Sequence, residues 1–436
     1  MRTYLSSMMR GILIGTAVVA ITLFAGCGSD DKITSADVGQ GDLNGLDFTT
    51  FISLGNSLTA GYQSAALTEK FADYSFPKQI ARQVGVADDF IQPLIEDPGI
   101  GSFVENDAGV LQLLSLNPLL ISPAPMSVEQ LAALASPGGP ANLLTNATYA
   151  LPYSNLGIPG VLGAEYPTAT SMASSISGSP FLDLVLRGQG TAVAQAVALT
   201  PTFATVWLGN NDVLGYAVSG GTNTNLPIPV AGVQAAVNAV VGALMGVDGC
   251  KIALATIPRV SDVPFFTTVK PYITTATGIP VLVDGEKQYW RGPGDVALGP
   301  DDLVLLTAKD SLLAGYGSVR ALTSEMVLNV AEQAVTNAAI TEYNAAIKAI
   351  AETPAWADRI ALVDMEALFE KIASGHFYFG GVHVTTAMVT GGLFSLDGVH
   401  PNSVGYGLVA NEFISAINAK FGSTIPLVNM NTLQGK

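Results

Sequence analysis

The chain has 436 residues and a formal net charge of −16 at pH 7. Hydrophobic residues make up 49% of it and charged residues 12%, a composition that excludes an intrinsically disordered protein. Because so acidic a chain repels phosphate backbones, nucleic acid is not an expected partner.

The first 26 residues have the features of a secretory signal peptide. Arg2 and Arg10 precede the apolar run 11–24, which is too short for an ordinary membrane-spanning helix. Small residues then precede Cys27, and this stretch resembles the lipobox of bacterial lipoproteins, in which cleavage leaves the cysteine to carry a lipid. We therefore predict a signal peptide over 1–26 and lipidation of Cys27. An ordinary secretory signal with an incidental cysteine is the alternative.

This prediction places the protein in the bacterial cell envelope as a lipid-anchored lipoprotein. The outer membrane is the favoured membrane, and either the periplasmic or the surface side is open. Residues 27–46 are polar and glycine-containing, which is typical of a flexible tether. The only other cysteine is Cys250, so a lipidated Cys27 leaves no intramolecular disulfide. Cys250 precedes an apolar strand candidate and is predicted to be a buried, unreactive thiol.

Short apolar runs alternate with helical patterns along the rest of the chain. The runs are apolar on both faces, as buried parallel strands are, and they cover residues 48–54, 202–208, 251–257 and 359–365. Helical periodicity covers residues 230–246, 323–352 and 403–421. This alternation predicts an α/β fold with a parallel sheet and helices on both of its faces.

Two stretches are too long for simple connections in such a fold. Residues 108–150 contain a single charged residue, Glu129, and residues 261–318 mix Gly, Pro, Thr and Asp with short apolar runs. We predict two insertions, at about 86–150 and 259–320, that pack over the top of the sheet. An apolar insertion there could form a lid or a groove for an acyl chain, and additional core packing is the alternative.

The stretch FISLGNSLTAGY ends the first strand candidate and places Ser57 in a Gly-Asn-Ser turn. A nucleophilic serine needs an exposed position at the carboxyl edge of a sheet, near N–H groups that can stabilise negative charge. A helix N-cap is the alternative, because serine is also favoured there.

Of the three histidines, His400 has the most informative surroundings. It follows Asp397 by three residues in SLDGVHPNSVGYG, and such a turn lets a carboxylate orient an imidazole. A capping turn before the last helix is the alternative. His376 and His383 flank FYFGGV, a hairpin or loop with no acidic residue close by in sequence. Because no HExxH, CxxC or closely spaced histidine pair occurs, we predict no metal site and no cofactor.

Two further strand exits carry small polar residues. In WLGNNDVLGY, residues 209–212 lie beyond the carboxyl end of a strand candidate, where open α/β sheets make ligand contacts, and an asparagine side chain there could donate to an oxyanion. In YSNLGIPGVLG, Gly160 could present a backbone N–H with no side chain in the way. Simple turns are the alternative at both positions.

In chain order, the blocks GNSL, NLGIPG, GNND and DGVHP resemble the four motif blocks of the SGNH (GDSL) esterase/lipase superfamily. The resemblance covers Phe51 to about Phe421. It implies a flavodoxin-like αβα sandwich with a mainly parallel sheet. It also implies that Ser57 is the nucleophile, His400 the catalytic base and Asp397 the acid that orients the base.

The same resemblance implies an oxyanion hole made by the N–H groups of Ser57 and Gly160 and the side chain of Asn211. Gly157 lies close to Gly160 and is the other glycine of that block. The aspartate of the family's GDSL block is Asn56 here. Asparagine keeps a side-chain acceptor that can hold the turn, but it lacks the charge.

The expected function is a serine esterase or lipase that hydrolyses carboxylic esters through an acyl-enzyme, with lipid-like or short-to-medium acyl esters favoured. A carbohydrate O-acetyl esterase is one alternative, and a non-catalytic surface-binding lipoprotein is another. The expected partners are the ester substrate and, through the lipid anchor, a membrane. We expect one hydrolase domain over 47–425 and a C-terminal tail over 426–436; the pattern makes no prediction of oligomeric state.

Overall fold

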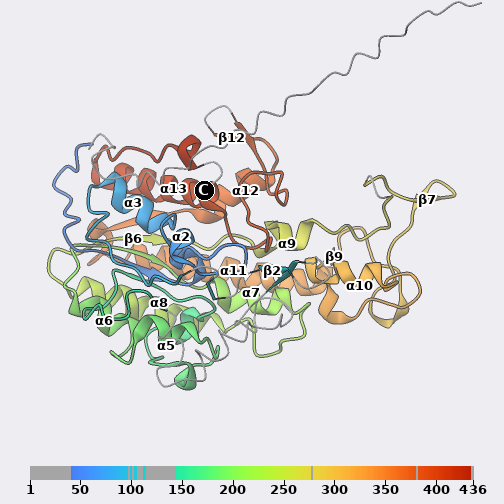
Figure 1. The fold of residues 1–436 in the computed structure, drawn as a ribbon, viewed down its shortest axis with the longest axis horizontal. Coiled ribbons are helices and arrows are strands. Elements are labelled where there is room, and N and C mark those ends of the chain that lie inside the picture. The colour runs from blue at the N-terminus through green and yellow to red at the C-terminus, as the bar shows by residue number, and fades with distance from the viewer. Residues whose placement is uncertain are drawn as a thin grey trace, which may run out of the picture. The chain divides into compact units, whose positions relative to one another are not determined.

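The computed structural model describes residues 41–96, 99–100, 103–105, 111–113, 144–275, 278–379 and 382–433 (Figure 1). All of them belong to one compact unit, Thr34–Lys436. The predicted signal peptide, Cys27 and the tether residues before 41 lie outside the described residues. Within the described ranges, no helix has both the length and the apolar character needed to cross a bilayer.

A five-stranded parallel sheet forms the centre of this unit. Its strands are β1 (Phe51–Gly55), β4 (Asn155–Gly157), β5 (Phe203–Trp207), β6 (Lys251–Ala255) and β11 (Ile360–Val363). Their spatial order is β11-β6-β5-β1-β4, and every neighbouring pair is parallel. Counted along the chain, this is the 2-1-3-4-5 order of flavodoxin-like sheets. The predicted fold class is confirmed.

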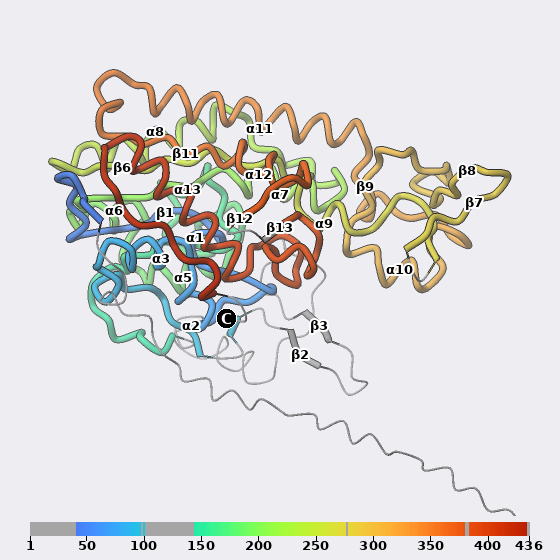
Figure 2. Tube along the Cα trace, turned by 90° about the horizontal axis from the view of Figure 1, so that it is seen from above, coloured from blue at the N-terminus to red at the C-terminus, as the bar shows by residue number. Residues whose placement is uncertain are grey.

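Helices cover both faces of the sheet (Figure 2). On one face α3 (Phe76–Gln83) packs on α13 (Ser403–Phe421), with α12 (Met365–Ala373) beside α13. On the other face α8 (Val230–Met245) packs on α11 (Val330–Ala351). Two shorter helices adjoin this second pair, α6 (Ala192–Ala198) beside α8 and α7 (Asn210–Val218) beside α11. The short helix α5 (Phe181–Leu186) lies beside β4, at the edge of the sheet.

The predicted elements agree with the observed ones except at the start of α11. All four predicted strands are present, with ends within three residues of the predicted ones, and α8 and α13 end within one residue. Helix α11 begins at Val330 rather than at 323, because Ser324–Met326 form a 3₁₀ turn and β10 (Val327–Leu328) pairs with β9 (Leu303–Val304). The apolar residues of this turn and strand mimic a helical pattern.

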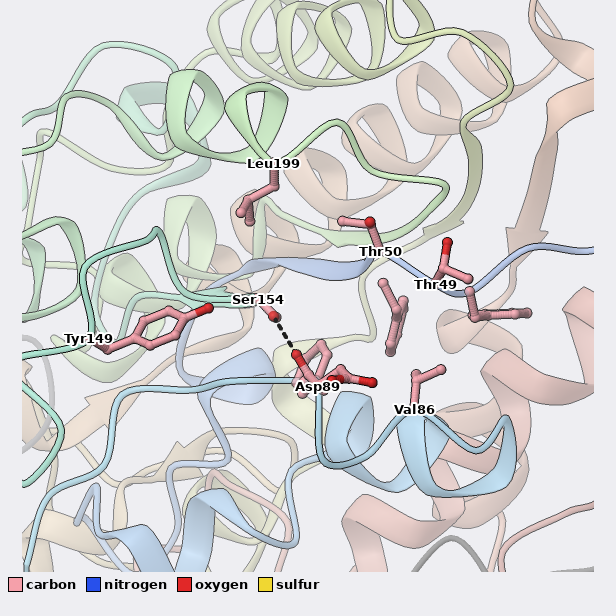
Figure 3. Close-up of a pocket in the computed structure, with 10 residues that line it drawn as sticks. Thr49, Thr50, Val86, Asp89, Tyr149, Ser154 and Leu199 are labelled. Carbon is pink, nitrogen blue, oxygen red and sulfur yellow. Dashed lines mark hydrogen bonds between the residues drawn. The ribbon is translucent and has the colours of Figure 1, made fainter.

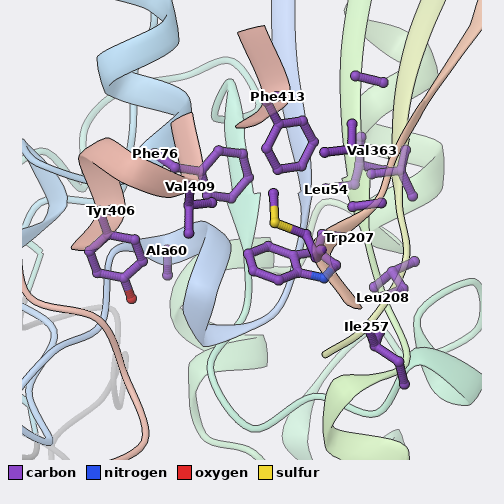
Figure 4. Close-up of a cluster of buried hydrophobic side chains, with 14 of the residues drawn as sticks. Leu54, Ala60, Phe76, Trp207, Leu208, Ile257, Val363, Tyr406, Val409 and Phe413 are labelled. Atoms are coloured by element: carbon purple, nitrogen blue, oxygen red, sulfur yellow. The ribbon is translucent and has the colours of Figure 1, made fainter. Parts of the chain in front are cut away.

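Aromatic side chains fill the space between the sheet and the face formed by α3 and α13 (Figure 4). Phe76 of α3 stacks on Phe413 of α13 at 4.6 Å between ring centroids, and Trp207 of β5 meets both rings edge-on. The Trp207 Nε1–H donates to the carbonyl of Thr256 at 3.0 Å, so its buried polar atom is paired. Each such fully buried ring stabilises the fold by roughly 1.5–3 kcal/mol. This packing fixes α13, and the segment that enters it, against the sheet.

Both ends of the described chain pack on α13 and its C-terminus. The Asp42 N–H donates to Thr424 Oγ1 at 2.9 Å, and the Thr424 N–H donates to the Asp42 carbonyl at 2.7 Å. Val428 makes two hydrogen bonds with the Asn411 side chain, at 2.6 and 3.1 Å. Residues 42–46, predicted as tether, and 426–433, predicted as tail, therefore pack on the folded domain, and four of their apolar side chains are buried: Leu46, Val428, Met430 and Leu433.

The second insertion packs largely on itself. Strands β7 (Leu282–Val283) and β8 (Glu286–Lys287) pair antiparallel, and α10 (Lys309–Leu313) follows them. A small apolar cluster, separate from the main core, holds this segment together: Leu298, Val304, Ala308, Leu322 and Val327. Figure 2 shows β7, β8 and α10 beyond α9 (Pro264–Thr267), to one side of the sheet. The base of this insertion, which includes Val260 and Val263, reaches the carboxyl edge of the sheet.

Most of the first insertion lies outside the described residues. Its described parts include two short strands, β2 (Phe103–Glu105) and β3 (Leu111–Leu113), which pair antiparallel. The predicted lid or acyl-chain groove in 108–150 therefore stays a prediction.

Cys250 lies just before β6 and is fully buried. Burial raises the pKa of its thiol to about 11, although the nearby Arg359 acts in the opposite direction. A thiol with this pKa stays protonated at neutral pH, in keeping with the predicted unreactive character.

Candidate active site

Three predicted site residues follow strands that are neighbours in the sheet. Ser57 follows β1, Gly160 follows β4 and Asn211 follows β5, and β1 lies between the other two strands. The strand order reverses at this point, and the carboxyl ends of strands at such a switch point are where open α/β sheets bind ligands. The fold therefore brings together residues from three distant stretches of sequence.

Ser57 is the first residue of a short helix, α1 (Ser57–Ala60). The N-cap of this helix is Asn56, whose Oδ1 accepts the N–H of Leu58 at 3.0 Å. The N-cap interpretation of Ser57 is therefore wrong, and its hydroxyl has a different partner. The side chain of Asn56 holds the turn as an uncharged acceptor, as expected for an asparagine in place of the family's aspartate.

A continuous chain of hydrogen bonds joins Ser57, His400 and Asp397. Ser57 Oγ lies 2.9 Å from His400 Nε2, and His400 Nδ1 lies 2.9 Å from Asp397 Oδ2. All three residues are at least 96% inaccessible to solvent. Because Nδ1 faces a carboxylate, it carries the ring proton, and Nε2 is left as an acceptor for the serine hydroxyl.

Asp397 accepts four hydrogen bonds. Its Oδ1 accepts the N–H groups of Val399 and His400 at 2.9 and 2.8 Å, and its Oδ2 accepts the N–H of Ala65 at 2.8 Å besides the imidazole. Burial by itself raises the pKa of this carboxyl, but His400 and the hydrogen bonds outweigh burial and hold the pKa below its usual value. Asp397 is therefore ionised at neutral pH.

A tight turn at 63–66 brings the Ala65 N–H to Asp397. Ser64 and Ala65 both have positive φ, 50° and 55°, a conformation that costs residues other than glycine roughly 1–3 kcal/mol each. Ser64 also contacts the acid loop, because its N–H donates to Ser395 Oγ at 2.8 Å. The strained turn thus fixes Asp397 against the segment that follows Ser57.

Gly160 occupies the third position of a turn whose first and fourth residues are Ile158 and Val161. The Val161 N–H donates to the Ile158 carbonyl at 3.2 Å, Pro159 is the second residue, and Gly160 has φ 76°. This is the geometry of a type II turn, which requires a residue with positive φ at that position. Within the described part of the chain, the Gly160 N–H donates to no protein acceptor.

The neighbouring glycine of the same block, Gly157, is required for the packing of β4 rather than for an available N–H. Its N–H already donates to Asn155 Oδ1 at 2.9 Å. A Cβ at this position would lie 2.3 Å from the Ala60 nitrogen, so only glycine lets β4 approach α1 this closely. Of the two glycines, Gly160 is therefore the one with an N–H available to a ligand.

Asn211 lines a cleft together with Ser57 and His400. Its Nδ2 donates to the carbonyl of Val161 at 2.8 Å. An amide nitrogen carries two hydrogens, so this bond uses one of them and fixes the direction of the other.

The cleft beside Ser57 and His400 is open to solvent and has mainly apolar walls. The apolar side chains come from α1, α7, the base of the second insertion, α12 and the loop before His400: Leu58, Leu214, Val260, Val263, Phe369 and Val399. Sequence reasoning did not find these walls, because no local signal distinguishes them from core residues. Arg259 at the cleft is paired with Glu370 at 3.0 Å.

A second hollow lies at the opposite edge of the sheet, near the starts of β1, β4 and β5 (Figure 3). Among its residues Ser154 Oγ donates to the carbonyl of Asp89 at 3.4 Å. This hollow has no histidine in its lining, so it lacks the base that the cleft at Ser57 has.

The other two histidines lie outside the cleft lining. His383 belongs to β13 (Val382–Val384), which pairs with β12 (Phe377–Phe379), and its Nε2 lies 2.7 Å from the carbonyl of Gly375. His376 directly precedes β12. In the described ranges, no three His, Cys, Asp or Glu side chains gather as metal ligands would.

The comparison with protein families agrees with this fold. Residues 52–413, most of the chain, match the model of the family described as GDSL-like Lipase/Acylhydrolase. The protein is a carboxylic ester hydrolase. It belongs, more specifically, to the GDSL-like lipase/acylhydrolase family. The search of curated proteins found no match.

Solved structures provide only distant likenesses. An acetylxylan esterase, Axe2 from Geobacillus stearothermophilus, is 14% identical, with 88% of this chain and 97% of that chain covered and a TM-score of 0.33. A putative GDSL-like lipase from Parabacteroides merdae is 12% identical, with 86% and 99% covered and the same TM-score, 0.33. Likenesses this low transfer no substrate and no residue role to this chain.

Proposed function

We propose that the protein hydrolyses carboxylic esters through an acyl-enzyme formed on Ser57, with His400 as general base and acid and Asp397 as the acid that orients His400. The observation that carries this proposal is the hydrogen-bond chain from Ser57 Oγ through His400 to Asp397, 2.9 Å at each of its two steps. Its place at the switch point of the sheet adds support, because the oxyanion donors can approach from both neighbouring strands.

In the first half-reaction, Ser57 Oγ attacks the ester carbonyl carbon while His400 Nε2 takes the hydroxyl proton. The bond to the alcohol oxygen then breaks, and His400 returns the proton to the leaving alcohol. In the second half-reaction, water attacks the acyl-enzyme and passes a proton to His400. The carboxylic acid leaves, and Ser57 regains its proton. The ionised Asp397 stabilises the imidazolium in both halves.

The oxyanion of each tetrahedral intermediate is proposed to accept hydrogen bonds from the N–H groups of Ser57 and Gly160 and from Asn211 Nδ2. The unused N–H of Gly160 and the second hydrogen on Asn211 Nδ2 support these assignments. Donors held in place before the reaction act strongly on the charge that develops in the transition state.

The substrates are proposed to be esters with an aliphatic, lipid-like or short-to-medium acyl group. The apolar walls of the cleft support this choice, because burial of hydrocarbon there is favourable. Among the described residues that line the cleft, Arg259 is the only arginine or lysine, and its pairing with Glu370 favours an uncharged ester over an anionic one.

The nucleophile is tested with a fluorophosphonate probe on the folded full-length chain. Wild-type protein should be labelled, Ser57→Ala should not be, and Ser154→Ala, which alters a serine at the second hollow, should be labelled as wild type is. Ester hydrolysis by Ser57→Ala at the wild-type rate would refute the mechanism. A folded wild-type protein that takes no label would favour a non-catalytic binding lipoprotein.

The substrate class is tested by comparing kcat/KM for nitrophenyl esters of acyl groups from two to twelve carbons with kcat/KM for acetylated xylo-oligosaccharides. We expect a maximum at four or more carbons. A preference for acetyl groups alone, with fast deacetylation of the oligosaccharides, would favour the carbohydrate O-acetyl esterase instead.

We further propose that Cys27 carries a lipid that anchors the enzyme to a bacterial cell envelope membrane, in keeping with the small residues that precede it. Expression with a labelled fatty acid should label the wild-type chain and leave Cys27→Ser unlabelled. Equal labelling of the two chains would refute lipidation at this cysteine.

A further inference from the structure

Three hydrogen bonds join the start of α7 to the loop after β4. In the first, the helix supplies the donor: Asn211 Nδ2 donates to the Val161 carbonyl of the loop at 2.8 Å. In the opposite direction, Asp212 Oδ2 accepts the N–H of Gly163 at 2.6 Å and Oδ1 accepts the N–H of Ala164 at 3.0 Å. We call this set of three bonds the clasp.

The clasp leaves no spare room between the two segments. A Cβ at Gly163 would lie 2.9 Å from the Gly209 nitrogen and 3.0 Å from Asp212 Oδ2. Gly209 itself has φ 105°, a conformation that suits glycine and turns the chain directly from β5 into α7. The loop after β4 therefore approaches the start of α7 as closely as the backbone allows.

The clasp connects two groups that the proposed mechanism needs in one place. Gly160 lies one residue before Val161, and Asn211 lies one residue before Asp212. Loss of the two bonds at Asp212 would leave a single bond, from Asn211 to Val161, to hold the loop to the helix. The distance between the Gly160 N–H and the Asn211 amide would then vary from molecule to molecule.

On this basis, and given the proposed function, we infer that Asp212 is a positioning residue: its carboxylate fixes the loop that carries Gly160 against the helix that carries Asn211, and so sets the geometry of the oxyanion hole. Asp212 touches no substrate in this role. It acts through two backbone N–H groups, and its effect should appear in transition-state binding rather than in substrate binding.

The electrostatic surroundings of Asp212 support a role that needs the charge. Asp212 is fully buried. Burial raises the pKa of its carboxyl to about 6, the bonds from Ala164 and Gly163 act in the opposite direction, and the nearby Glu165 adds to the rise. The other titratable group facing it, Tyr343 of α11, is uncharged at neutral pH. Among the described residues, no cationic side chain compensates this carboxylate, so the folded protein carries a destabilising charge whose contacts are these N–H groups.

Two variants alter the clasp in different ways. Asp212→Asn keeps the shape of the side chain, but one of its two terminal atoms becomes an N–H₂ group, which cannot accept from Gly163 or Ala164. Gly163→Ala keeps the charge and forces the loop away from Gly209. Both should lower kcat by about 10–100-fold and leave KM within about threefold, because displacements near 1 Å have effects of this size.

Glu165→Gln is the matched control. Glu165 is also a buried carboxylate that accepts backbone N–H groups, from Leu162 at 3.1 Å, Ser177 at 3.0 Å and Ile176. All of these bonds join residues of the segment that follows β4, and none of them reaches α7. If general rigidity of the loop were responsible, this variant would lose as much kcat as Asp212→Asn. We expect its kcat to stay within about threefold of wild type.

The experiment measures kcat and KM for one short ester, together with inhibition by an alkyl boronic acid, which forms a tetrahedral adduct with a nucleophilic serine. In Asp212→Asn and Gly163→Ala, boronate affinity should fall by about the same factor as kcat, while KM stays nearly constant. Wild-type kcat in folded Asp212→Asn, or an equal loss in Glu165→Gln, would overturn the inference. Ser57→Ala is measured in parallel: activity there would refute the proposed function itself, an outcome distinct from failure of the clasp.

Discussion

The structure on each side of Ser57 contains one buried carboxylate, but the pKa values of the two carboxylates are shifted in opposite directions. On one side, the loop before α13 presents His400 and holds the buried Asp397, which has the imidazole and three backbone N–H groups as partners. On the other side, α7 and the loop after β4 meet at the buried Asp212, which has two backbone N–H groups from that loop and, within the described ranges, no cation as partners. Each side thus has one buried carboxylate that receives N–H donors.

The two carboxylates differ in one partner. Asp397 contacts His400, whose imidazole can become a cation, whereas the contacts of Asp212 are backbone N–H groups. The pKa of Asp397 lies below its usual value and that of Asp212 rises to about 6, although both are buried. Backbone N–H groups alone do not compensate burial at Asp212, whereas the same kind of donors plus His400 do so at Asp397. A carboxylate beside the base is therefore stabilised by its surroundings, and one on the oxyanion side is tolerated at a cost in stability.

The largest effect is expected from neutralising the acid on the base side. Asp397→Asn should lower kcat by about 10⁴-fold, because the amide no longer holds the imidazole with its proton on Nδ1. Rapid-mixing measurements of acyl-enzyme formation with a nitrophenyl ester would test this. Loss of less than tenfold in a folded variant would mean that the two sides of Ser57 do not differ in the way proposed.

A smaller loss is expected on the oxyanion side. Asn211→Ala should lower kcat by about 10²–10³-fold, since one oxyanion donor is removed. Asn411→Ala is the control: it is a buried asparagine whose amide also donates to a backbone carbonyl, that of Val428, but it lies on α13 away from the cleft lining. The control should lower Tm and leave kcat near wild type. Equal kcat losses in the two variants would contradict the assignment of Asn211.

The two acids should respond to pH in opposite ways. Asp397 has a lowered pKa, so it stabilises the fold above the unfolded value of about 3.8, and this contribution is lost as the pH falls through the lower folded value. Asp212 has a raised pKa, so it costs stability above about pH 6, and the cost disappears below about 3.8. From 3.8 to about 6, at about 1.36 kcal/mol per pKa unit, this cost is about 3 kcal/mol.

Urea unfolding of Asp212→Asn and Asp397→Asn at pH 7.5 and pH 5 would measure this contrast. At pH 7.5 the Asp212 variant should be as stable as wild type or more so, and its advantage should shrink at pH 5. The Asp397 variant should be less stable than wild type at both values. A stability loss in Asp212→Asn that grows as the pH rises would show that its charge is compensated after all.

The smallest effect is expected at the turn that supports Asp397. The Leu396 N–H donates to Ser64 Oγ at 3.4 Å, so Ser64→Ala removes one long hydrogen bond and leaves the Ala65 N–H in place. We expect a stability loss of about 0.5–1.5 kcal/mol and a kcat within about tenfold of wild type. Thermal unfolding and steady-state kinetics would check this. A kcat loss as large as that of Asp397→Asn would give the turn a role beyond support.

Local patterns in the sequence were sufficient for the fold, and together with the family resemblance they predicted the residues of the candidate site. Buried strands are continuous apolar runs, and Ser57 and Asn211 each follow one of them, so their meeting at one sheet edge could be predicted. Gly160 follows the short strand β4, which is not such a run, and its place came from the glycine-containing turn. The spacing of Asp397 and His400 is short enough for their contact to be local. These features depend on residues close together in sequence or on a common sheet edge.

Features that depend on loop conformation could not be predicted. Asp212 meets Gly163 and Ala164 across 49 and 48 residues, and nothing in GNND indicates which N–H groups it will accept. Neither serine nor alanine signals the positive φ of Ser64 and Ala65, which the hydrogen bonds between Gln63 and Ala66 and the contacts with the acid loop stabilise. The cleft walls at Val263 and Phe369 come from an insertion and a helix whose apolar residues resemble any other core residues.

The long separation of Ser57 and His400 along the chain also has a consequence for the time at which activity can arise. Ser57 is separated from His400 by 343 positions. At roughly 5–20 residues per second, a ribosome needs roughly 17–70 s to cover that distance. On the proposed mechanism, the nascent chain carries the nucleophile without its base during this interval. The enzyme would then become competent only when translation is nearly complete, and a chain that ends before His400 would form no acyl-enzyme.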